Sequence, residues 1–298
     1  MSNVTQLHGS TYVEPSSPFP QDSPLYFTAV ERPLKWQHKD GVSHFLVDTH
    51  KMLLRANDQQ FPIQLAVVGE GWQMVQNKEL FQGVEEQFIE AFSPDELNGV
   101  RVRDSMSYAG RMCLREYQFP NVRCDSPGVS DIAFRTIVKN GFGGSSIALY
   151  TGAIDFFCTN GMISGKYDCM YARHTKGLRL TDITQRVRRS IKAFYENNAT
   201  WWRWYGNSIT IEEAKVFLLD RYSERLAEKL LRQYRIETHS HGENMWALYS
   251  AMTYYATHDE GDFATRNTGV DHSATTLLKR EEQVQSVIAS DAWLRLAA

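Results

Sequence analysis

A helical pattern inside a strongly basic segment, residues 173–205, constrains the fold of this chain more than any other feature. One face of the pattern is apolar, with residues at spacings of four, four and three: Ile183, Val187, Ile191 and Phe194. Asp182 followed by Gln185 resembles a capping box, which predicts that the helix begins near residue 182. At about 100° per residue, Arg188, Arg189 and Lys192 fall on the opposite face, with Arg186 at its edge.

The charge of this segment is opposite to that of the whole chain. The segment has only two acidic residues, Asp182 and Glu196, within a chain of net charge −3. Its cations are Arg173, Lys176, Arg179, Arg186, Arg188, Arg189, Lys192 and Arg203. Like charges at helical spacing repel one another, and the segment offers no acidic residue on the cationic face to relieve them. An anionic partner would relieve that repulsion.

Four aromatic rings close the segment around one arginine: Trp201, Trp202, Trp204 and Tyr205, with Arg203 among them. If these residues form a strand, Trp201 and Arg203 share one side, and Trp202 and Trp204 share the other. At least one ring is therefore expected to stay accessible. Two interpretations remain open: a solvated cationic face beside a Trp-rich core corner, or a site for single-stranded nucleic acid, where arginines neutralise phosphates and rings stack on bases.

Composition is consistent with a soluble protein that has a substantial core. The chain has 298 residues, of which 42% are hydrophobic, so it is long enough for one large domain or two. Its four cysteines form no CxxC pair, which favours a reduced, cytoplasmic setting. We see no secretory signal and no apolar run of the roughly 20 residues that a membrane helix needs, so no membrane association is expected.

The first half of the chain predicts strands around one helix. Residues 1–24 are rich in Ser, Pro and Gln and predict a flexible or loosely docked arm. Residues 64–77 predict strand, turn and strand, and residues 78–92 predict a helix. Residues 99–120 predict strands on which alternating arginines, including Arg101, Arg103 and Arg115, line an exposed face. Residues 132–140 and 147–157 predict two more strands joined by a glycine-rich hairpin turn. A phosphate loop at 141–146 is disfavoured, because no Gly-Lys-Ser/Thr follows.

The second half predicts helices. Thr210 and Glu213 form a capping box for a helix reaching about Tyr234, and further helices are expected over 244–258 and 272–294. We therefore expect an α+β protein with an antiparallel or mixed sheet in its N-terminal part and a helical C-terminal part packed on it. The expected division is an arm (1–24), a sheet-containing region (25–177) and a mainly helical region (178–298), the last two forming one compact unit.

Four blocks resemble a phage- and plasmid-borne family known only as a domain of unknown function: AVVGEGWQMVQNKELF (66–81), NGFGGSSIALYTGAIDFFCTNGM (140–162), ARHT (172–175) and NMWALYSAMTYYATH (244–258). The chain departs from the family pattern at Trp72, where many members carry Tyr, and at 140–143, where a frequent N.HDG is absent. The resemblance implies a mobile-element origin, an α+β fold and a link to phage DNA metabolism. The chain also resembles single-stranded-DNA-binding early proteins of phages that carry a virion RNA polymerase.

Enzyme patterns are weaker. His239 and His241 could share a metal, with His258, Asp259 and Asp262 downstream, but their spacing matches no hydrolase signature. Cys158 could pair with His174, but the thiol follows two phenylalanines, and buried cysteines are mostly inert. We therefore expect no catalytic residue, metal or cofactor.

The expected function is sequence-tolerant binding of single-stranded DNA by a homo-oligomer, in phage replication, recombination or early transcription, with phage or host RNA polymerase as a further candidate partner. The expected site comprises the eight cations of residues 173–205 together with Trp201, Trp202, Trp204 and Tyr205. The alternatives are a host-directed protein-binding factor and a metal-dependent phosphodiesterase that uses the region from His239 to Asp262.

Overall fold

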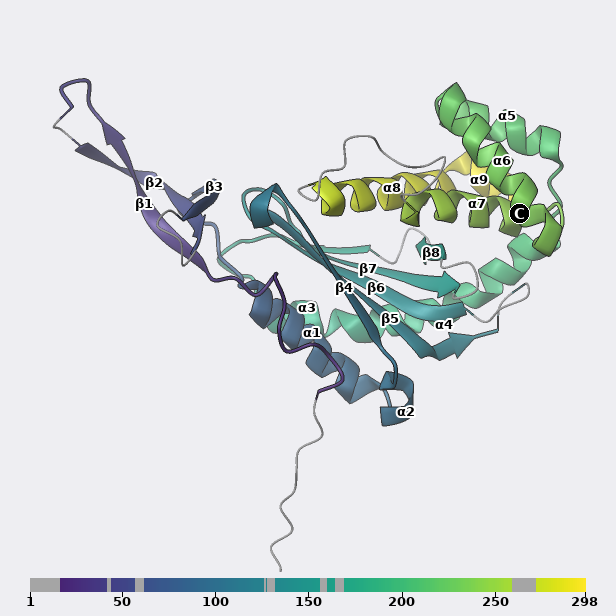
Figure 1. The fold of residues 1–298 in the computed structure, drawn as a ribbon, viewed down its shortest axis with the longest axis horizontal. Helices are drawn as coiled ribbons and strands as arrows, with labels where there is room; N and C mark the ends of the chain where they lie inside the picture. Colours follow the sequence, from purple (N-terminus) through teal and green to yellow (C-terminus); the bar gives the residue numbers. More distant parts are fainter. Residues whose placement is uncertain are drawn as a thin grey trace, which may run out of the picture.

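The protein is an α+β molecule, as predicted. The computed structural model describes residues 17–41, 44–56, 62–125, 127, 132–155, 160–163, 169–258 and 272–298. Within these ranges, two antiparallel sheets occupy the N-terminal part and helices dominate after residue 180. The larger sheet lies between two layers of helices, and the smaller sheet extends away from this body as an arm (Figure 1).

The smaller sheet has three antiparallel strands in the order β1 (Ala29–Gln37), β2 (His44–Arg55) and β3 (Ile63–Gly69). Its base packs around a small apolar cluster that includes Leu53, Leu65 and Phe142. The distal parts of β1 and β2 project beyond this base as a two-stranded ribbon (Figure 1). The sequence predicted a second strand between β3 and residue 77, and this prediction is wrong. Trp72 makes a single bridge to Thr175, and the chain then passes directly into the next helix.

The larger sheet contains β4 (Arg101–Ser107), β5 (Met112–Cys124), β6 (Ile132–Gly141) and β7 (Ile147–Asp155) in sequence order, all antiparallel. A short 3₁₀ turn, η1 (Tyr108–Gly110), joins β4 to β5. The outer edge of β7 is shared by β8 (Asn160–Ile163) and β9 (Cys169–Ala172), which pair with its two halves. The strands predicted at 132–140 and 147–157 are confirmed over the described residues, and every residue of β6 is buried because both faces of the sheet are covered.

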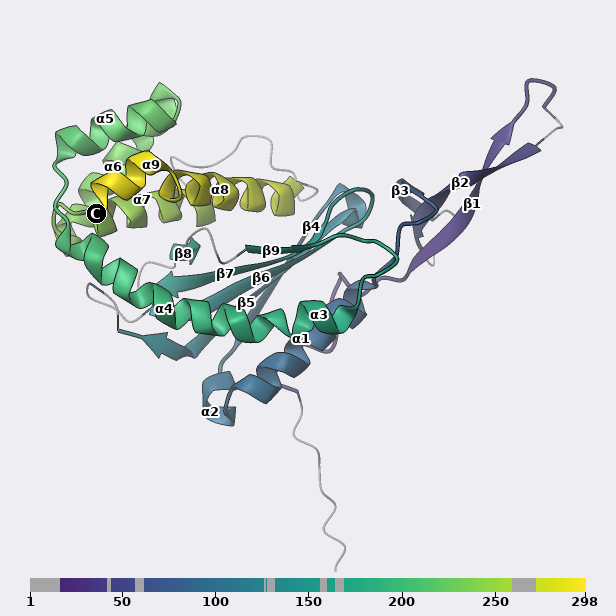
Figure 2. The same ribbon diagram turned by 180° about the vertical axis from the view of Figure 1, so that it is seen from behind.

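One face of the sheet is covered by α1 (Asn77–Ala91), α3 (Leu180–Thr184) and α4 (Arg186–Gly206), with α2 (Pro94–Leu97) beyond the end of α1 (Figure 2). Phe88 of α1 and Phe194 of α4 both pack against Phe134 of β6. The helix predicted over 78–92 is confirmed. The helix predicted to begin near residue 182 begins at Leu180 and breaks at Gln185, so Asp182 lies inside a first short helix and forms no capping box.

The other face is covered by α8 (Ser273–Ile288), whose Ala274 and Leu278 pack on Leu114 and Ile137. Beside it, α7 (Met245–Thr257) reaches beyond the sheet to α4. The helices α5 (Ile211–Arg221), α6 (Glu224–His241) and α9 (Asp291–Leu296) complete this end of the molecule (Figure 1). The Thr210–Glu213 capping box is present, but the predicted helix to Tyr234 is two helices, because the backbone turns to an extended conformation at Tyr222 and Ser223.

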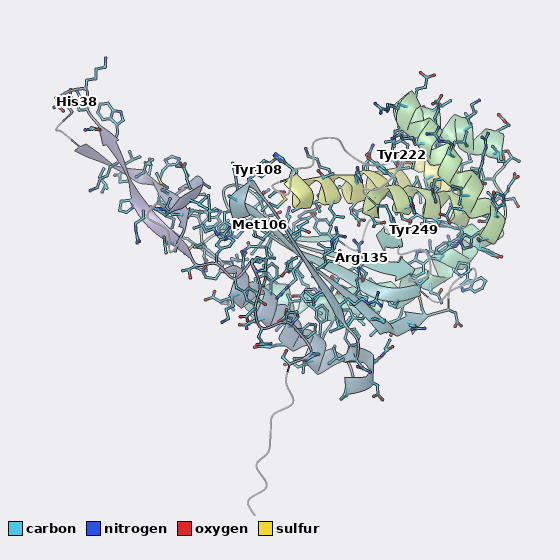
Figure 3. All side chains as sticks on the ribbon, in the orientation of Figure 1. His38, Met106, Tyr108, Arg135, Tyr222 and Tyr249 are labelled. Carbon is cyan, nitrogen blue, oxygen red and sulfur yellow. The ribbon has the colours of Figure 1, made fainter. Side chains whose placement is uncertain are left out.

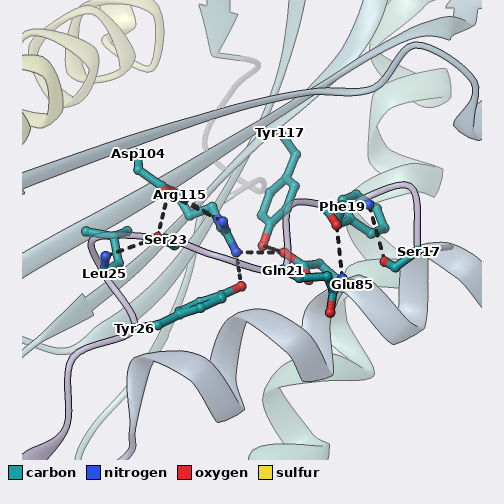
Figure 4. A network of polar contacts seen from close by, with 10 residues as sticks. All are labelled: Ser17, Phe19, Gln21, Ser23, Leu25, Tyr26, Glu85, Asp104, Arg115 and Tyr117. Carbon is teal, nitrogen blue, oxygen red and sulfur yellow. Dashed lines mark hydrogen bonds and ion pairs between the residues drawn. The ribbon is translucent and has the colours of Figure 1, made fainter.

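The arginines of β4 and β5 do not share one exposed face. Arg101 and Arg103 are exposed, whereas Arg115 is fully buried on the side of the sheet that faces α1. Its guanidinium contacts Glu85 and Asp104, each at 2.9 Å, and the Tyr26 hydroxyl (Figure 4). On the opposite side of the sheet, buried Arg135 lies between Glu116 and Glu281 of α8.

The last residues of the expected N-terminal arm are docked on the body. Phe19 is buried against Phe88, Tyr117 and Phe119. The Ser23 hydroxyl donates to Asp104 at 2.6 Å, beside the buried arginine (Figure 4). Residues 1–16 lie outside the described residues.

Candidate nucleic-acid interface

The basic segment forms an amphipathic helix whose inner face closes the core. The predicted apolar positions of α4 point inward, with Val187 and Phe194 fully buried. Trp201 and Trp204 continue this face. Trp201 is 1% exposed and packs against Trp246, and Trp204 packs against Tyr249 and Trp293 at 4.9 and 5.2 Å between ring centroids. These two predicted site residues therefore belong to the core and are unavailable for stacking.

The outer face of α4 carries cations and exposed rings in its first three turns and again near its end, with exposed Glu196 and Ala199 between them. Because the aromatic segment is helical and not a strand, Trp202 and Arg203 lie on the same side as the cations of the first turns. We call this face the outer stripe, and all its members are exposed: Arg188, Arg189, Lys192, Tyr195, Trp202 and Arg203. Trp202 is 46% exposed, and Tyr205 contacts it edge-on from the margin of the stripe. The prediction that at least one ring stays accessible is confirmed.

Two stripe cations have acidic neighbours, which corrects the expectation that nothing relieves their repulsion. Arg188 pairs with Glu90 of α1 at 3.1 Å, and Lys192 pairs with Glu196 one turn along α4 at 3.3 Å. Both pairs are well exposed to solvent, so each contributes little to stability. Arg189 and Arg203 make no ion pair within the described part of the chain. The stripe therefore keeps an excess of positive charge.

A polar hollow adjoins the stripe where α1, α3 and the start of α4 meet. Its lining includes Gln87, Thr181 and Gln185 together with the Arg188–Glu90 pair. The hollow therefore offers hydrogen-bond donors and one cation beside a carboxylate.

The loop before α3 brings three further cations near the start of this helical segment. Arg173, Lys176 and Arg179 are all exposed. His174 between them is buried: its ring stacks on Trp72 at 4.4 Å, and its Nδ1 lies 2.9 Å from the Gln73 carbonyl oxygen. Burial lowers the pKa of His174, which favours a neutral ring. His174 therefore anchors the basic loop to the chain after β3.

Arg186 lies at the edge of the cationic face of α4, as predicted. Its guanidinium donates to the Tyr171 carbonyl oxygen at 3.1 Å, so it links α4 to β9 and points away from the stripe. Sequence reasoning missed Tyr195, which is exposed on the stripe. Its spacing of three from Lys192 and seven from Trp202 is the signal that would have found it.

The residues considered for an enzyme are not assembled into a cluster where they are described. His239 and His241 lie in the last turn of α6, and positions two apart on a helix face different directions. His239 contacts the Arg235 carbonyl oxygen, and His241 lies 3.7 Å from Glu237. No group of three or more possible metal ligands occurs among the described residues. Cys158, Asp259 and Asp262 lie outside them.

A family described as Domain of unknown function (DUF932) matches residues 64–281, which is most of the chain. The chain belongs to the DUF932 family. The matched region runs from β3 to α8 and therefore includes the whole larger sheet, the basic loop and the outer stripe of α4. Searches of curated proteins and of solved structures each gave no match. None of the helices in the described ranges is long and apolar enough to cross a bilayer.

Proposed function

We propose that this DUF932 protein binds single-stranded DNA without reading its sequence, along the outer stripe of α4. The observation that carries the proposal is the combination, on one exposed helix face, of four cations with an exposed tryptophan and tyrosine. Cations that neutralise phosphates, together with rings on which bases stack, are the two components that such binding requires.

The basic loop extends the same surface. The three exposed cations of residues 173–179 precede the stripe, and buried His174 fixes the position of their loop. A strand of DNA lying along α4 would meet these cations first, and Trp202 and Arg203 last. The proposed setting is phage replication, recombination or early transcription inside the host cell, in keeping with the resemblance to phage proteins that bind single-stranded DNA.

The number of DNA phosphates that the protein contacts determines how strongly the binding constant depends on salt concentration. If about five phosphates are neutralised, log K against log salt should have a slope of about −3 to −4 for single strands. The measurement is fluorescence anisotropy with labelled oligo(dT), a duplex of the same length and a matched RNA oligomer, each over a salt series. Arg189→Ala combined with Arg203→Ala should reduce the slope by about 1.4, since each lost contact contributes about 0.7.

A matched control removes two exposed cations from another part of the molecule, Lys215 of α5 and Arg225 of α6, by substitution with Ala. This control should leave the slope unchanged. Equal slopes for the wild type and the stripe variant would remove α4 from the site. Binding confined to an acidic protein, with no affinity for any nucleic acid, would favour a host-directed protein-binding factor instead.

The rings give an independent test of the same surface. Oligo(dT) should quench tryptophan fluorescence, and Trp202→Ala should cost about 1–3 kcal/mol of binding with little loss of stability. Trp201→Ala should instead lower stability by about 3–5 kcal/mol, because that ring fills the core. Normal DNA affinity in a folded Trp202→Ala variant would rule out stacking on this ring.

A further inference from the structure

Residues 17–26, which we call the N-terminal strap, lie across the junction between α1 and the larger sheet (Figure 4). All of these residues are described, and none belongs to a helix or a strand. Phe19 and Leu25 are buried, and the Leu25 carbonyl oxygen accepts a hydrogen bond from the Asn77 side chain at 2.8 Å. Side chains therefore hold the strap in place of a ladder of backbone hydrogen bonds, and a segment held in this way can open without unfolding the body.

Beneath the strap, one buried cation lies between two carboxylates. Arg115 is fully buried, and Glu85 is 4% exposed. The guanidinium of Arg115 contacts Glu85 and Asp104, each at 2.9 Å. When all three groups are ionised, one negative charge is in excess in a place from which water is largely excluded. Such a charge costs free energy until water reaches it.

The strap covers both ends of this charged cluster. The Ser23 hydroxyl donates to Asp104 at 2.6 Å. The ring of Tyr26 lies over the Arg115 guanidinium, with 4.8 Å between the guanidinium carbon and the ring centroid, and the Tyr26 hydroxyl contacts the same group (Figure 4). Removal of the strap would therefore let water reach the carboxylates.

One group in the cluster changes charge near neutral pH. The groups that face Glu85 are Arg115 and Tyr117 of β5, Tyr26 of the strap and Asp104 of β4. Burial raises the pKa of both tyrosines above the usual 10. Burial lowers the pKa of Arg115, but Tyr117 and the two carboxylates raise it above its usual value. These three groups therefore keep their protons between pH 5 and 8. For Glu85, burial outweighs the attraction of Arg115 and raises the pKa to about 7.

We propose that the N-terminal strap is a pH-sensitive switch, which detaches from the body when Glu85 loses its proton. The ionised carboxylate favours the open strap, because opening lets water hydrate it, whereas the protonated carboxyl favours the closed strap. Opening also exposes the apolar surface that Phe19 covers, which includes Phe88 and Phe119. The proposal goes beyond DNA binding and is tested without nucleic acid.

The test is hydrogen exchange of the full chain, measured by mass spectrometry at pH 5, 6, 7 and 8. The exchange rate of residues 17–26, divided by the rate of an unstructured peptide of the same sequence at the same pH, gives the equilibrium constant for opening of the strap. If the pKa of Glu85 is the usual 4.5 in the open state and about 7 in the closed state, this constant should rise about 40-fold from pH 5 to pH 7 and less than about twofold further by pH 8.

The internal reference is β6, whose residues are all buried and whose Arg135 lies against Glu281 of α8 (Figure 3). A strand in this position exchanges when the whole body unfolds. Its opening constant should therefore stay below that of the strap at each pH. Equal constants for the strap and β6 would mean that the strap opens only with the rest of the molecule, which would overturn the proposal.

Two variants separate the carboxyl group from the strap. Glu85→Gln keeps the size of the side chain but cannot ionise, so its strap should open to the same extent at all four pH values, close to the wild type at pH 5. Ser23→Ala keeps the buried charges but removes the bond to Asp104, and it should raise the opening constant about tenfold at each pH. A wild-type strap that does not respond to pH, a Glu85→Gln variant with the wild-type response, or a Ser23→Ala strap that stays as closed as in the wild type would each overturn the proposal.

Discussion

At the scale of single residues, the carboxyl group of Glu85 lies buried in a network of charged and polar side chains. It lies 2.9 Å from Arg115 and accepts a hydrogen bond from the Tyr117 hydroxyl, yet burial raises its pKa to about 7. The loss of water outweighs the attraction of the arginine, which Asp104 also contacts. Glu85 is therefore a buried acid that titrates near neutral pH.

This pKa predicts a pH-dependent stability. Between the usual value of 4.5 and about 7, the folded chain holds a proton on Glu85 that the unfolded chain releases. The free energy of unfolding should therefore fall as pH rises through this window, by about 2 to 3 kcal/mol at most. Urea unfolding at a series of pH values measures the fall.

Glu85→Gln is the control for this prediction, because it keeps the size of the side chain and an oxygen that can accept from Tyr117. The variant should show a shallower pH dependence than the wild type over the same window. His174, whose pKa is lowered, acts in the opposite direction but is present in both proteins, so the difference between them isolates Glu85. Identical pH profiles would contradict the raised pKa.

At the scale of elements, the turn between β6 and β7 is where the two sheets meet. Gly143 and Gly144 both adopt a left-handed backbone, with φ of 78° and 96°. A Cβ on Gly143 would lie 2.3 Å from the Cβ of Ala66 in β3, whereas a Cβ on Gly144 would meet nothing within 4 Å. The glycines of this loop therefore serve a tight turn and a close approach to the smaller sheet.

These two glycines form a matched pair for mutation. Gly144→Ala should cost about 1 to 2 kcal/mol from backbone strain alone. Gly143→Ala should cost about 1 to 3 kcal/mol more, because the added methyl also collides with Ala66. Urea unfolding of both variants measures the difference. Equal losses of unfolding free energy in the two variants would mean that the two sheets separate enough at this turn to accommodate the methyl group.

At the scale of the whole molecule, one core joins the sheet to the helices. A single buried cluster contains Phe19 near the N-terminus, Phe134 of the larger sheet, Trp201 of α4 and Trp293 of α9. This main cluster therefore spans the sheet-containing and helical regions, and two smaller clusters lie beside it, one under α8 and one at the base of the smaller sheet.

A shared core predicts a single cooperative unfolding transition. Phe19→Ala and Trp293→Ala each remove a buried ring, at opposite ends of the sequence, and each should lower the free energy of unfolding by about 3–5 kcal/mol. Circular dichroism and tryptophan fluorescence should report the same midpoint in each variant. Two separate transitions, each shifted by only one of the substitutions, would show that the two regions unfold independently.

The sequence by itself determined the features that depend on local periodicity. Spacings of three and four predicted α1 and the inner face of α4, and turn residues predicted the β6–β7 hairpin. The same periodicity placed Arg188, Arg189 and Lys192 on the outer face. These predictions succeed because an apolar pattern with the period of a helix or strand can be buried in only one way.

Only the tertiary structure decided which of several similar residues is buried. Arg103 and Arg115 both stand in strands, but Arg115 is buried because Asp104 and Glu85, the latter 30 residues away, both contact its guanidinium. Trp201 and Trp202 are adjacent, and the contact with Trp246 of α7 determines which ring enters the core. The projection of the β1–β2 ribbon from the body likewise has no local signature. It follows from contacts between distant segments, and the pattern of neighbouring residues does not specify such contacts.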